Sequence, residues 1–478
     1  MKKSLKISIL LIILIALVSL LTMYYGSTDL NDYAGVAKFF AGDYPAKIRS
    51  SHSLLYGYLV SPLVKISHSF FFLKVLNLFF LILLSISLYY ISNKNSRTLL
   101  LFLISPIVWY IAPWISPLLL SSLLFLWGFF FISKFEDNKN LLNLVFSGIL
   151  IGLSLAFWNT VIFIIFFLLI CFFYSRKVSH LFYFLLSVLA GFSPLLIFDK
   201  IFYDFAFYST LKFLFGIATM SIYKSIYPGI NQIASSFSSY LSFILLLPLF
   251  FYLLFSREVF SENRKQIIFL ALSFLFFLVN PQPRYIFFLW PILILYLSPR
   301  LNEKQFKIQS AIFIVITLIV IAPYLIQINY STNAKDFTSV ISNFGNWKIT
   351  DDTYELISQD LEEISKEYPN ETFVVGNHPD VYTDLALAYW GGNIKEIVSI
   401  QDYDMYLKNQ SVLFEKKFMS VPKIKDRRLI WIGGGLEKAP DDTDCNAINL
   451  GIGFREPIAL QDFKILKKYR ILYLSIRD

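Results

Sequence analysis

Long apolar runs separated by short polar stretches fill the first two thirds of the chain. Each run has roughly 15–22 residues, the length that an α-helix needs to cross about 30 Å of hydrocarbon. The pattern predicts a mainly α-helical, polytopic transmembrane bundle of about eleven helices. The predicted spans are residues 7–25, 70–91, 99–113, 117–133, 141–157, 159–174, 180–198, 236–255, 266–280, 285–298 and 309–327.

Lysine and arginine are unevenly divided between the two sets of loops. With the N-terminus inside, the inner loops hold Lys2, Lys3, Lys6, Lys94, Arg97, Lys134, Lys139, Arg176, Lys177, Arg257, Arg264, Lys265, Arg300, Lys304 and Lys307. The outer loops are longer but hold only Lys38, Lys47, Arg49, Lys65, Lys200, Lys212, Lys224 and Arg284. Because cytoplasmic loops carry the excess of positive charge, we expect a cytoplasmic N-terminus and an extracytoplasmic C-terminus.

Three long polar regions then share the outer face: residues 26–69, 199–235 and 329–478. The third is expected to be a small extracytoplasmic α/β domain, because short β-type runs alternate with helical ones. The chain therefore divides into a membrane domain, 1–328, and a soluble domain, 329–478. The predicted strands of the soluble domain are 372–375, 397–400, 429–432 and 471–474, and its predicted helices are 351–367, 381–390 and 401–415.

Composition agrees with an integral protein of the cell (plasma) membrane. Hydrophobic residues make up 56% of the chain and charged residues only 16%, against about 25% charged in soluble domains. The basic N-terminus and the first apolar run mimic a signal peptide, but Met23-Tyr24-Tyr25 is a poor cleavage site, so the run is interpreted as a retained helix. The net charge of +9 is explained by topology rather than by nucleic acid binding. The two cysteines, Cys171 and Cys445, predict neither a disulfide nor thiol chemistry.

The first chemical motif is Ser27-Thr28-Asp29-Leu30-Asn31-Asp32-Tyr33, directly after the first helix. Carboxylates are costly near hydrocarbon, so a pair at the interface is a functional-site candidate. Asp29 and Asp32 are three apart, and on a helical turn both face the same way. They are therefore candidates for a general base, or for ligands of Mg²⁺ or Mn²⁺, although a hard cation usually takes more than two ligands. The alternative is that Asp29 or Asn31 caps a helix that starts near Asp32.

The surroundings of this motif resemble the first outer loop of the GT-C superfamily of membrane glycosyltransferases, in particular the relatives of protein O-mannosyltransferases and aminoarabinose transferases. The resemblance consists of Asp29, Tyr33, Ala37 and Ala41-Gly42-Asp43, followed by the polar stretch Ser51–Tyr58. It implies an amphipathic helix in the loop, a catalytic Asp29, and substrate contacts from Tyr33 and Tyr56. His52 lies in the same loop as Asp29 and is a candidate catalytic or substrate-contacting residue; the alternative is an interfacial polar residue. The family's Asp-Glu pair is Asp29-Leu30 here and its Pro-Pro is absent, so Asp32 is the candidate second carboxylate.

A second motif, Asn280-Pro281-Gln282-Pro283-Arg284-Tyr285, precedes a late apolar run. A guanidinium at the outer interface suits a lipid phosphate, and the family often has an Arg-Tyr pair here. Lys200 and Lys212 of the second outer loop are further candidates for phosphate contacts. The alternative for Arg284 and Tyr285 is an interfacial anchor, and the alternative for both lysines is a solvated face.

The predicted function is transfer of a sugar from a polyprenyl- or dolichyl-phosphate donor to a glycan, lipid or protein acceptor on the outer face, by an inverting displacement. The alternatives are a flippase or transporter of lipid-linked sugars, a polysaccharide polymerase, and a membrane scaffold with an outer binding domain. Transporters place charges deep in the bundle and contain inverted repeats. The sequence shows no internal repeat and its charges lie in the predicted loops, which favours the enzyme.

Overall fold

The computed structural model describes residues 3–21, 33, 36–37, 40–41, 54–66, 71–173, 177–203, 205–211, 213–214, 264–277, 283–325, 359–360, 362–364, 366–368, 372–375, 396–399, 429–434, 464–469 and 472–477. The chain forms two compact units. The first comprises residues 1–27, 70–197 and 234–348, and the second comprises 28–69, 198–233 and 349–478. The predicted boundary at residues 328 and 329 falls on undescribed residues and stays a prediction.

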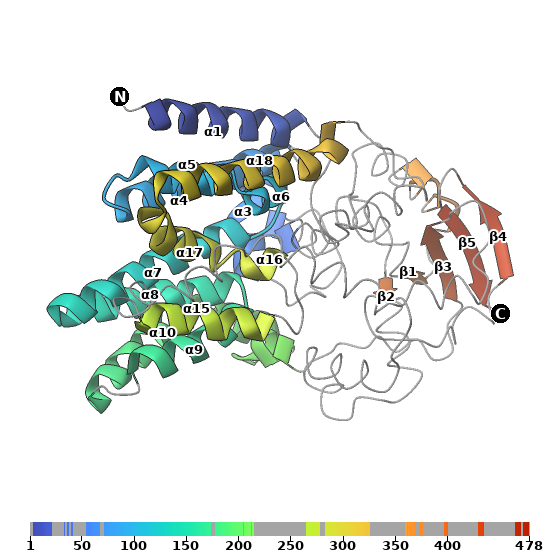
Figure 1. Ribbon diagram of the computed structural model, residues 1–478. Coiled ribbons are helices and arrows are strands. Elements are labelled where there is room, and N and C mark those ends of the chain that lie inside the picture. The colour runs from blue at the N-terminus through green and yellow to red at the C-terminus, as the bar shows by residue number, and fades with distance from the viewer. Residues whose placement is uncertain are drawn as a thin grey trace. The chain divides into compact units, whose positions relative to one another are not determined.

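The first unit is a bundle of apolar helices (Figure 1). Its helices are α1 (Lys3–Leu21), α4 (Phe71–Ile91), α5 (Ser96–Leu103), α6 (Pro106–Ile111), α7 (Leu118–Asn138), α8 (Leu141–Phe157), α9 (Val161–Phe173), α10 (Val178–Tyr203, whose last turns belong to the second unit), α15 (Arg264–Phe277), α16 (Pro283–Ile286), α17 (Trp290–Leu297) and α18 (Glu303–Leu325). Within the described residues, α1, α4, α7 and α10 contain segments long and apolar enough to cross a membrane. The chain is therefore an integral membrane protein, as predicted.

Two predicted helices are interrupted by proline. The run 99–113 forms α5 and α6, which are separated at Ile104-Ser105 because Pro106 starts a new helix at its first position. The run 285–298 likewise forms α16 and α17, with Pro291 in the first turn of α17. Proline lacks the backbone N–H that would continue the preceding helix, so each run bends where one straight span is expected. The predicted span 236–255 lies outside the described residues.

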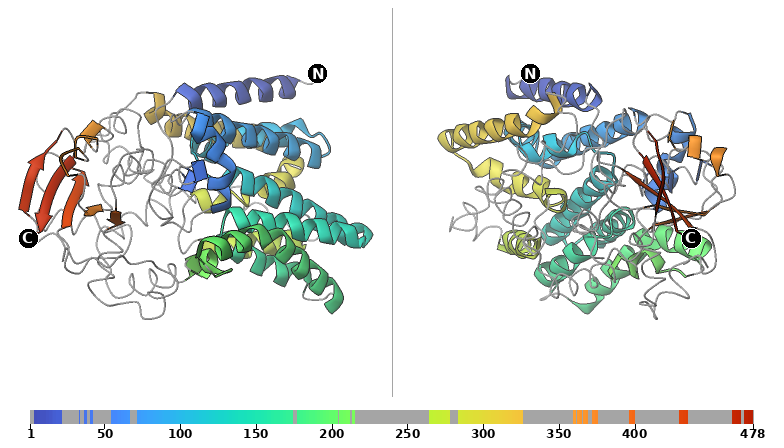
Figure 2. Two further views of the ribbon diagram at one scale, coloured as in Figure 1. Left: turned by 180° about the vertical axis from the view of Figure 1, so that it is seen from behind. Right: turned by 90° about the vertical axis from the view of Figure 1, so that its right-hand side faces the viewer.

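Glycine lets α8 and α10 approach at backbone distance. A Cβ on Gly152 would lie 2.1 Å from the carbonyl oxygen of Val188, and one on Gly191 would lie 2.0 Å from that of Ile149. Two residues after Gly152 on α8, Ser154 exchanges hydrogen bonds with Ser121 of α7, with 2.8 Å between the two hydroxyl oxygens. Small residues at such interfaces are typical of membrane helices, whose association depends on close packing. Figure 2 shows α7, α8 and α10 running alongside one another.

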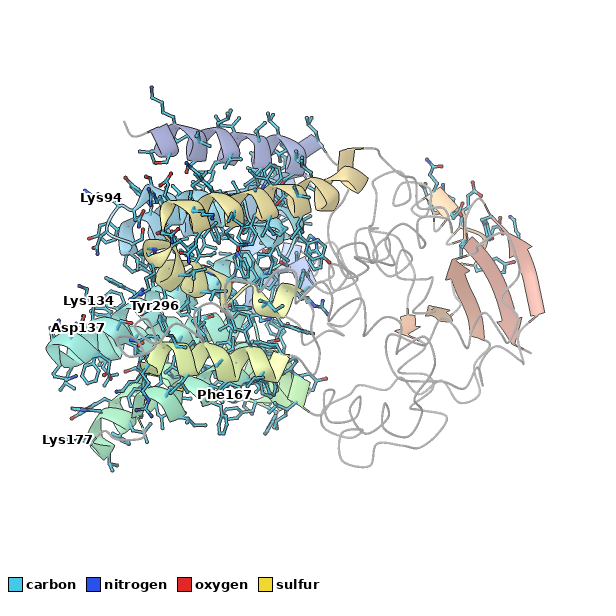
Figure 3. The ribbon with its side chains drawn as sticks, viewed as in Figure 1. Lys94, Lys134, Asp137, Phe167, Lys177 and Tyr296 are labelled. Carbon is cyan, nitrogen blue, oxygen red and sulfur yellow. The ribbon has the colours of Figure 1, made fainter. Side chains whose placement is uncertain are left out.

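Charged side chains gather at one end of this bundle. Lys94, Lys134, Asp137 and Lys177 all lie there (Figure 3), although they come from three different loops or helix ends. At the same end Arg97 pairs with Glu303 at 2.6 Å. This end carries loops that the charge pattern assigns to the cytoplasmic side of the membrane.

The second unit contains a five-stranded mixed sheet in the order β2-β1-β3-β5-β4. Its strands are β1 (Thr372–Val375), β2 (Glu396–Ser399), β3 (Leu429–Gly434), β4 (Lys464–Lys468) and β5 (Leu472–Arg477). β1 is parallel to β2 and β3, whereas β5 is antiparallel to β3 and β4. Four of these strands match predicted runs, which confirms an α/β tail. The predicted helices 381–390 and 401–415 lie outside the described residues, and 351–367 is helical in its described part.

The strand that the sequence did not reveal is β4. Its sequence Lys-Ile-Leu-Lys-Lys is too cationic for a typical β-type run, but charge is common on a sheet edge, where it discourages further pairing. The sheet is joined to the preceding helical segment through Glu367, whose carboxylate accepts hydrogen bonds from Tyr469 at 2.8 Å and from Lys467. The hydrogen bond from Lys467 is the main reason that the pKa of Glu367 lies below its usual value.

Candidate functional site

The predicted site residues fall into three groups. Asp29, Asp32, His52 and Lys212 lie outside the described residues, so their roles stay predictions. Tyr33, Tyr56 and Lys200 belong to the second unit. Arg284 and Tyr285 belong to the first.

Tyr33 and Tyr56 contact each other, as expected of residues that share one site. Their ring centroids lie 5.7 Å apart at an interplanar angle of 78°, an edge-to-face arrangement. Both side chains are buried, and Tyr56 is completely inaccessible to solvent. Tyr56 lies in the first turn of α3 (Leu54–Ile66), a helix that begins within the polar stretch that the sequence singled out.

The hydroxyl of Tyr56 is a buried polar group that has no hydrogen-bond partner among the described residues. Burial raises the pKa of this phenol far above its ordinary value, so the group keeps its proton and stays a hydrogen-bond donor. A buried unpaired hydroxyl costs about 1–3 kcal/mol, and native proteins keep few such groups. Among the described residues, the hydroxyl of Tyr56 is therefore an unused donor, in a side chain that contacts Tyr33.

Gly57 sets how closely the segment after the acidic motif packs on α3. A Cβ at Gly57 would lie 2.3 Å from Cγ1 of Val36 and 3.1 Å from the backbone nitrogen of Ala37. Side chains never approach that closely, so only glycine permits this contact. Ala37 is one of the residues that carry the family resemblance, and its position is explained by this close approach.

An aromatic cluster joins the first outer loop to the end of α10. Phe40 contacts Tyr58 and Phe202, each at 5.3 Å between ring centroids, and Phe198 at 5.7 Å. Phe198 also contacts Tyr58 at 5.2 Å. The two long outer loops that the sequence identified separately thus start from a shared apolar core. Lys200, between Phe198 and Phe202, is exposed.

Asp199 is a buried carboxylate that the sequence analysis did not single out. Its Oδ1 accepts a hydrogen bond from the hydroxyl of Ser209 at 2.5 Å, and its Oδ2 accepts one from the backbone N–H of Ser209 at 2.9 Å. Both bonds fix the segment 205–211, part of the second outer loop, against the end of α10. The signal was present as an Asp close to the end of an apolar run, next to the lysine that was chosen.

Arg284 lies on an aromatic platform in the first unit. Its guanidinium carbon is 5.1 Å from the centroid of the Tyr285 ring, and its Nη2 is 3.4 Å from the Tyr285 hydroxyl. Tyr285 in turn stacks on Phe277 of α15, with centroids 5.9 Å apart and an interplanar angle of 14°. The stack holds a planar, permanently charged group at the start of α16, a geometry suited to a phosphate.

A buried lysine corrects the expectation that all charges lie in loops. Lys74 of α4 is only 2% exposed, and its ammonium donates to the carbonyl oxygen of Ser19 at 2.9 Å. Ser19 is in the last turn of α1, where carbonyls lack partners within the helix. One turn along α4, the amide of Asn77 donates to the carbonyl oxygen of Ala112 at the end of α6. One face of α4 thus ties down the ends of two other helices.

No group of three or more His, Cys, Asp or Glu side chains occurs among the described residues. Asp29 and Asp32, the predicted ligands of a divalent cation, are outside them. A metal site at this pair stays a prediction.

No protein-family model matches the chain, and no curated protein matches it in sequence. Solved structures do. The chain is similar to ArnT from Cupriavidus metallidurans, both bound to undecaprenyl phosphate and in the apo state, with a TM-score of 0.51 and 10% identity over 99% of this chain and 97% of that chain. It is also similar to an apo oligosaccharyltransferase from Archaeoglobus fulgidus, with a TM-score of 0.49 and 11% identity over 88% of this chain and 69% of that chain. The likeness to ArnT shows that this chain shares the fold of that protein over nearly its whole length.

Proposed function

We propose that the chain is a membrane glycosyltransferase that moves a sugar from a polyprenyl- or dolichyl-phosphate donor to an acceptor hydroxyl on the outer face of the membrane. The observation that supports this proposal is the fold that the chain shares, over nearly its whole length, with ArnT bound to undecaprenyl phosphate. The acceptor is a glycan, a lipid or a protein. The N-terminus is cytoplasmic and the soluble tail, 329–478, is extracytoplasmic.

Arg284 and Tyr285 are proposed to bind the donor phosphate. The Tyr285 ring stacks on Phe277, and the guanidinium of Arg284 lies over the Tyr285 ring. These contacts restrict the guanidinium, so less conformational entropy is lost when it binds an anion. Lys200 and Lys212 of the second outer loop supply further positive charge. As the sugar leaves, negative charge grows on the phosphate, and a fixed cation stabilises that charge more in the transition state than in the ground state.

Asp29 is proposed as the general base. It removes the proton of the acceptor hydroxyl as that oxygen forms a bond to the anomeric carbon of the sugar. The bond from the anomeric carbon to the phosphate oxygen breaks, and the polyprenyl phosphate leaves with its electron pair. Attack from the opposite side inverts the anomeric centre. Asp32 is the second carboxylate of the motif, and it orients the acceptor or Asp29.

Tyr33, His52 and Tyr56 are proposed to contact the substrate. Tyr56 is the best supported of the three, because its buried hydroxyl is a donor with no hydrogen-bond partner among the described residues.

The test is sugar transfer by purified protein incubated with radiolabelled polyprenyl-phosphate sugars and a membrane extract. We expect Asp29→Asn to lose at least 100-fold in rate, the lower end of a general base's contribution. Asp137→Asn is the matched control, because Asp137 is an exposed carboxylate at the charged end of the bundle (Figure 3). Equal transfer by wild type and Asp29→Asn would refute the role of Asp29. No transfer from any donor by folded wild type would refute the proposed function.

A flippase of lipid-linked sugars is the second candidate, and the observation that favours it is Lys74. Ionisable groups buried in membrane helices often mark transport pathways. The hydrogen bond to Ser19 gives Lys74 a structural explanation instead. Translocation of a fluorescent polyprenyl-phosphate sugar in liposomes that depends on the protein, without transfer to any acceptor, would establish the flippase.

A further inference from the structure

An open pocket of about 470 Å³ lies at the charged end of the first unit, in a place that the proposed reaction does not use. It is formed by the start of α1, the turn before α5, the first turns of α5 and the start of α18. Its lining residues are Ser4, Asn93, Lys94, Asn95, Ser96, Arg97, Leu100, Glu303 and Phe306. The lining is thus mostly polar, with an apolar floor from Leu100 and Phe306.

The pocket is held together from several elements. The hydroxyls of Ser4 and Ser96 are 2.5 Å apart, which joins α1 to α5. Asn95 caps α5 by accepting a hydrogen bond from the backbone N–H of Arg97 at 3.0 Å. Arg97 reaches α18, where it pairs with Glu303 and lies 5.6 Å from the centre of the Phe306 ring.

The charge balance of the lining leaves one cation over. Glu303 is the only acidic residue in the lining, and it binds Arg97 at 2.6 Å and Lys307 at 3.4 Å. Lys94 forms no ion pair with any described residue, and it is an exposed residue of the pocket lining. The positive end of the α5 dipole faces the same side. The pocket therefore favours an anion.

The position of the pocket relates it to lipid. Directly after Ser4, α1 exposes Ile7, Ile9, Leu10 and Ile13, which is the surface that a membrane helix turns toward hydrocarbon. Ser4, which lines the pocket, is also the first residue of the apolar segment Ser4–Leu21, so the pocket adjoins the end of a candidate membrane span, where phospholipid headgroups lie. Cationic residues at this depth attract anionic lipids.

We propose that this pocket binds a phosphate group, with Lys94 as its cationic donor and the N-terminus of α5 adding a favourable dipole. A phospholipid headgroup and a soluble phosphate compound share this chemistry. The apolar surface of α1 beside the pocket favours the headgroup of an anionic phospholipid.

The test is the thermal stability of the full-length protein in detergent, titrated separately with phosphatidylglycerol, phosphatidylcholine and inorganic phosphate. We expect phosphatidylglycerol to raise Tm saturably and Lys94→Gln to weaken that binding about fivefold, the contribution of one interfacial cation. Lys94→Arg should keep the binding. Lys134→Gln is the control, because Lys134 is an exposed lysine at the same end but outside the pocket.

A saturable effect of inorganic phosphate that is also lost in Lys94→Gln would support the phosphate site and assign it to a soluble ligand. If Lys94→Gln and Lys134→Gln weakened phosphatidylglycerol binding equally, the proposed site would be overturned. The lipid would then be attracted by the overall positive charge of this end of the bundle. The absence of any Lys94-dependent effect from all three additions would overturn it as well. None of these readouts depends on sugar transfer.

Discussion

Removal of the Tyr56 hydroxyl, which has no partner among the described residues, is expected to change stability and activity in opposite directions. Tyr56→Phe removes a buried polar group that has no partner and leaves the ring contact with Tyr33 in place. We expect the ligand-free variant to be more stable by about 1 kcal/mol, measured as a higher Tm in detergent. We also expect slower sugar transfer, because the donor that the substrate would use is gone.

The two readouts separate the explanations for this hydroxyl. Higher stability with unchanged transfer would show that the group is only a packing defect. Lower stability would show that it has a partner in the folded protein.

Lys74 is expected to stabilise the bundle. Lys74→Met keeps an apolar side chain of nearly the same length but removes the ammonium that donates to the Ser19 carbonyl. Removal of the ammonium also relieves its desolvation cost, which opposes the first effect. Because the ammonium lies at the C-terminal end of α1, where a cation is favourable, we expect a net loss of about 1–3 kcal/mol in thermal or chemical unfolding.

Lys65→Met is the matched control, since Lys65 is an exposed lysine of α3. Its stability should change by less than about 0.5 kcal/mol. If Lys74→Met were as stable as the wild type, the hydrogen bond to Ser19 would contribute nothing net.

At the scale of elements, Gly152 decides how closely α8 and α10 pack. Alanine favours helix over glycine by about 1 kcal/mol, so propensity alone predicts that Gly152→Ala stabilises the protein. The new Cβ would lie 2.1 Å from a backbone carbonyl oxygen of α10, which cannot move without the whole helix. We therefore expect a loss of about 1–3 kcal/mol in unfolding measurements, from overpacking. A gain would mean that the two helices separate more easily than their packing indicates.

The sequence predicted most helices well and their interruptions poorly. Residues 141–157 were predicted as a span and form α8 with the same ends, because Asn140 caps the helix and Trp158 leaves it. The run 99–113 was predicted as one helix because hydropathy does not register that Pro106 starts a new one. β4 was missed for a related reason, since an edge strand does not need an apolar pattern.

The candidate site was predicted only in part, because the sequence does not show which polar side chains are buried in the folded protein. Tyr33 and Tyr56 were selected by resemblance, and the structure brings their rings into contact. Lys74 and Asp199 were not selected because each lies within or at the end of an apolar run. A single charged residue there is easily interpreted as the end of a membrane helix. Lys74 donates to the carbonyl oxygen of Ser19, and Asp199 accepts from Ser209. No local sequence pattern relates either pair of residues.

At the scale of the whole molecule, the direction of insertion connects the charge pattern to the proposed function. Lys94, Lys134 and Lys177 come from different predicted inner loops, yet their side chains gather at one end of the bundle (Figure 3). The positive-inside rule assigns that end to the cytoplasm.

In a variant with Cys171 and Cys445 replaced by Ser, we expect a membrane-impermeant maleimide to label Asn370→Cys on intact cells. Asn138→Cys should react only after permeabilisation. If both positions reacted from the same side, the number of crossings between residues 138 and 370 would differ from prediction. If their accessibility were reversed, Asp29 would face the cytoplasm, and transfer on the outer surface would be ruled out.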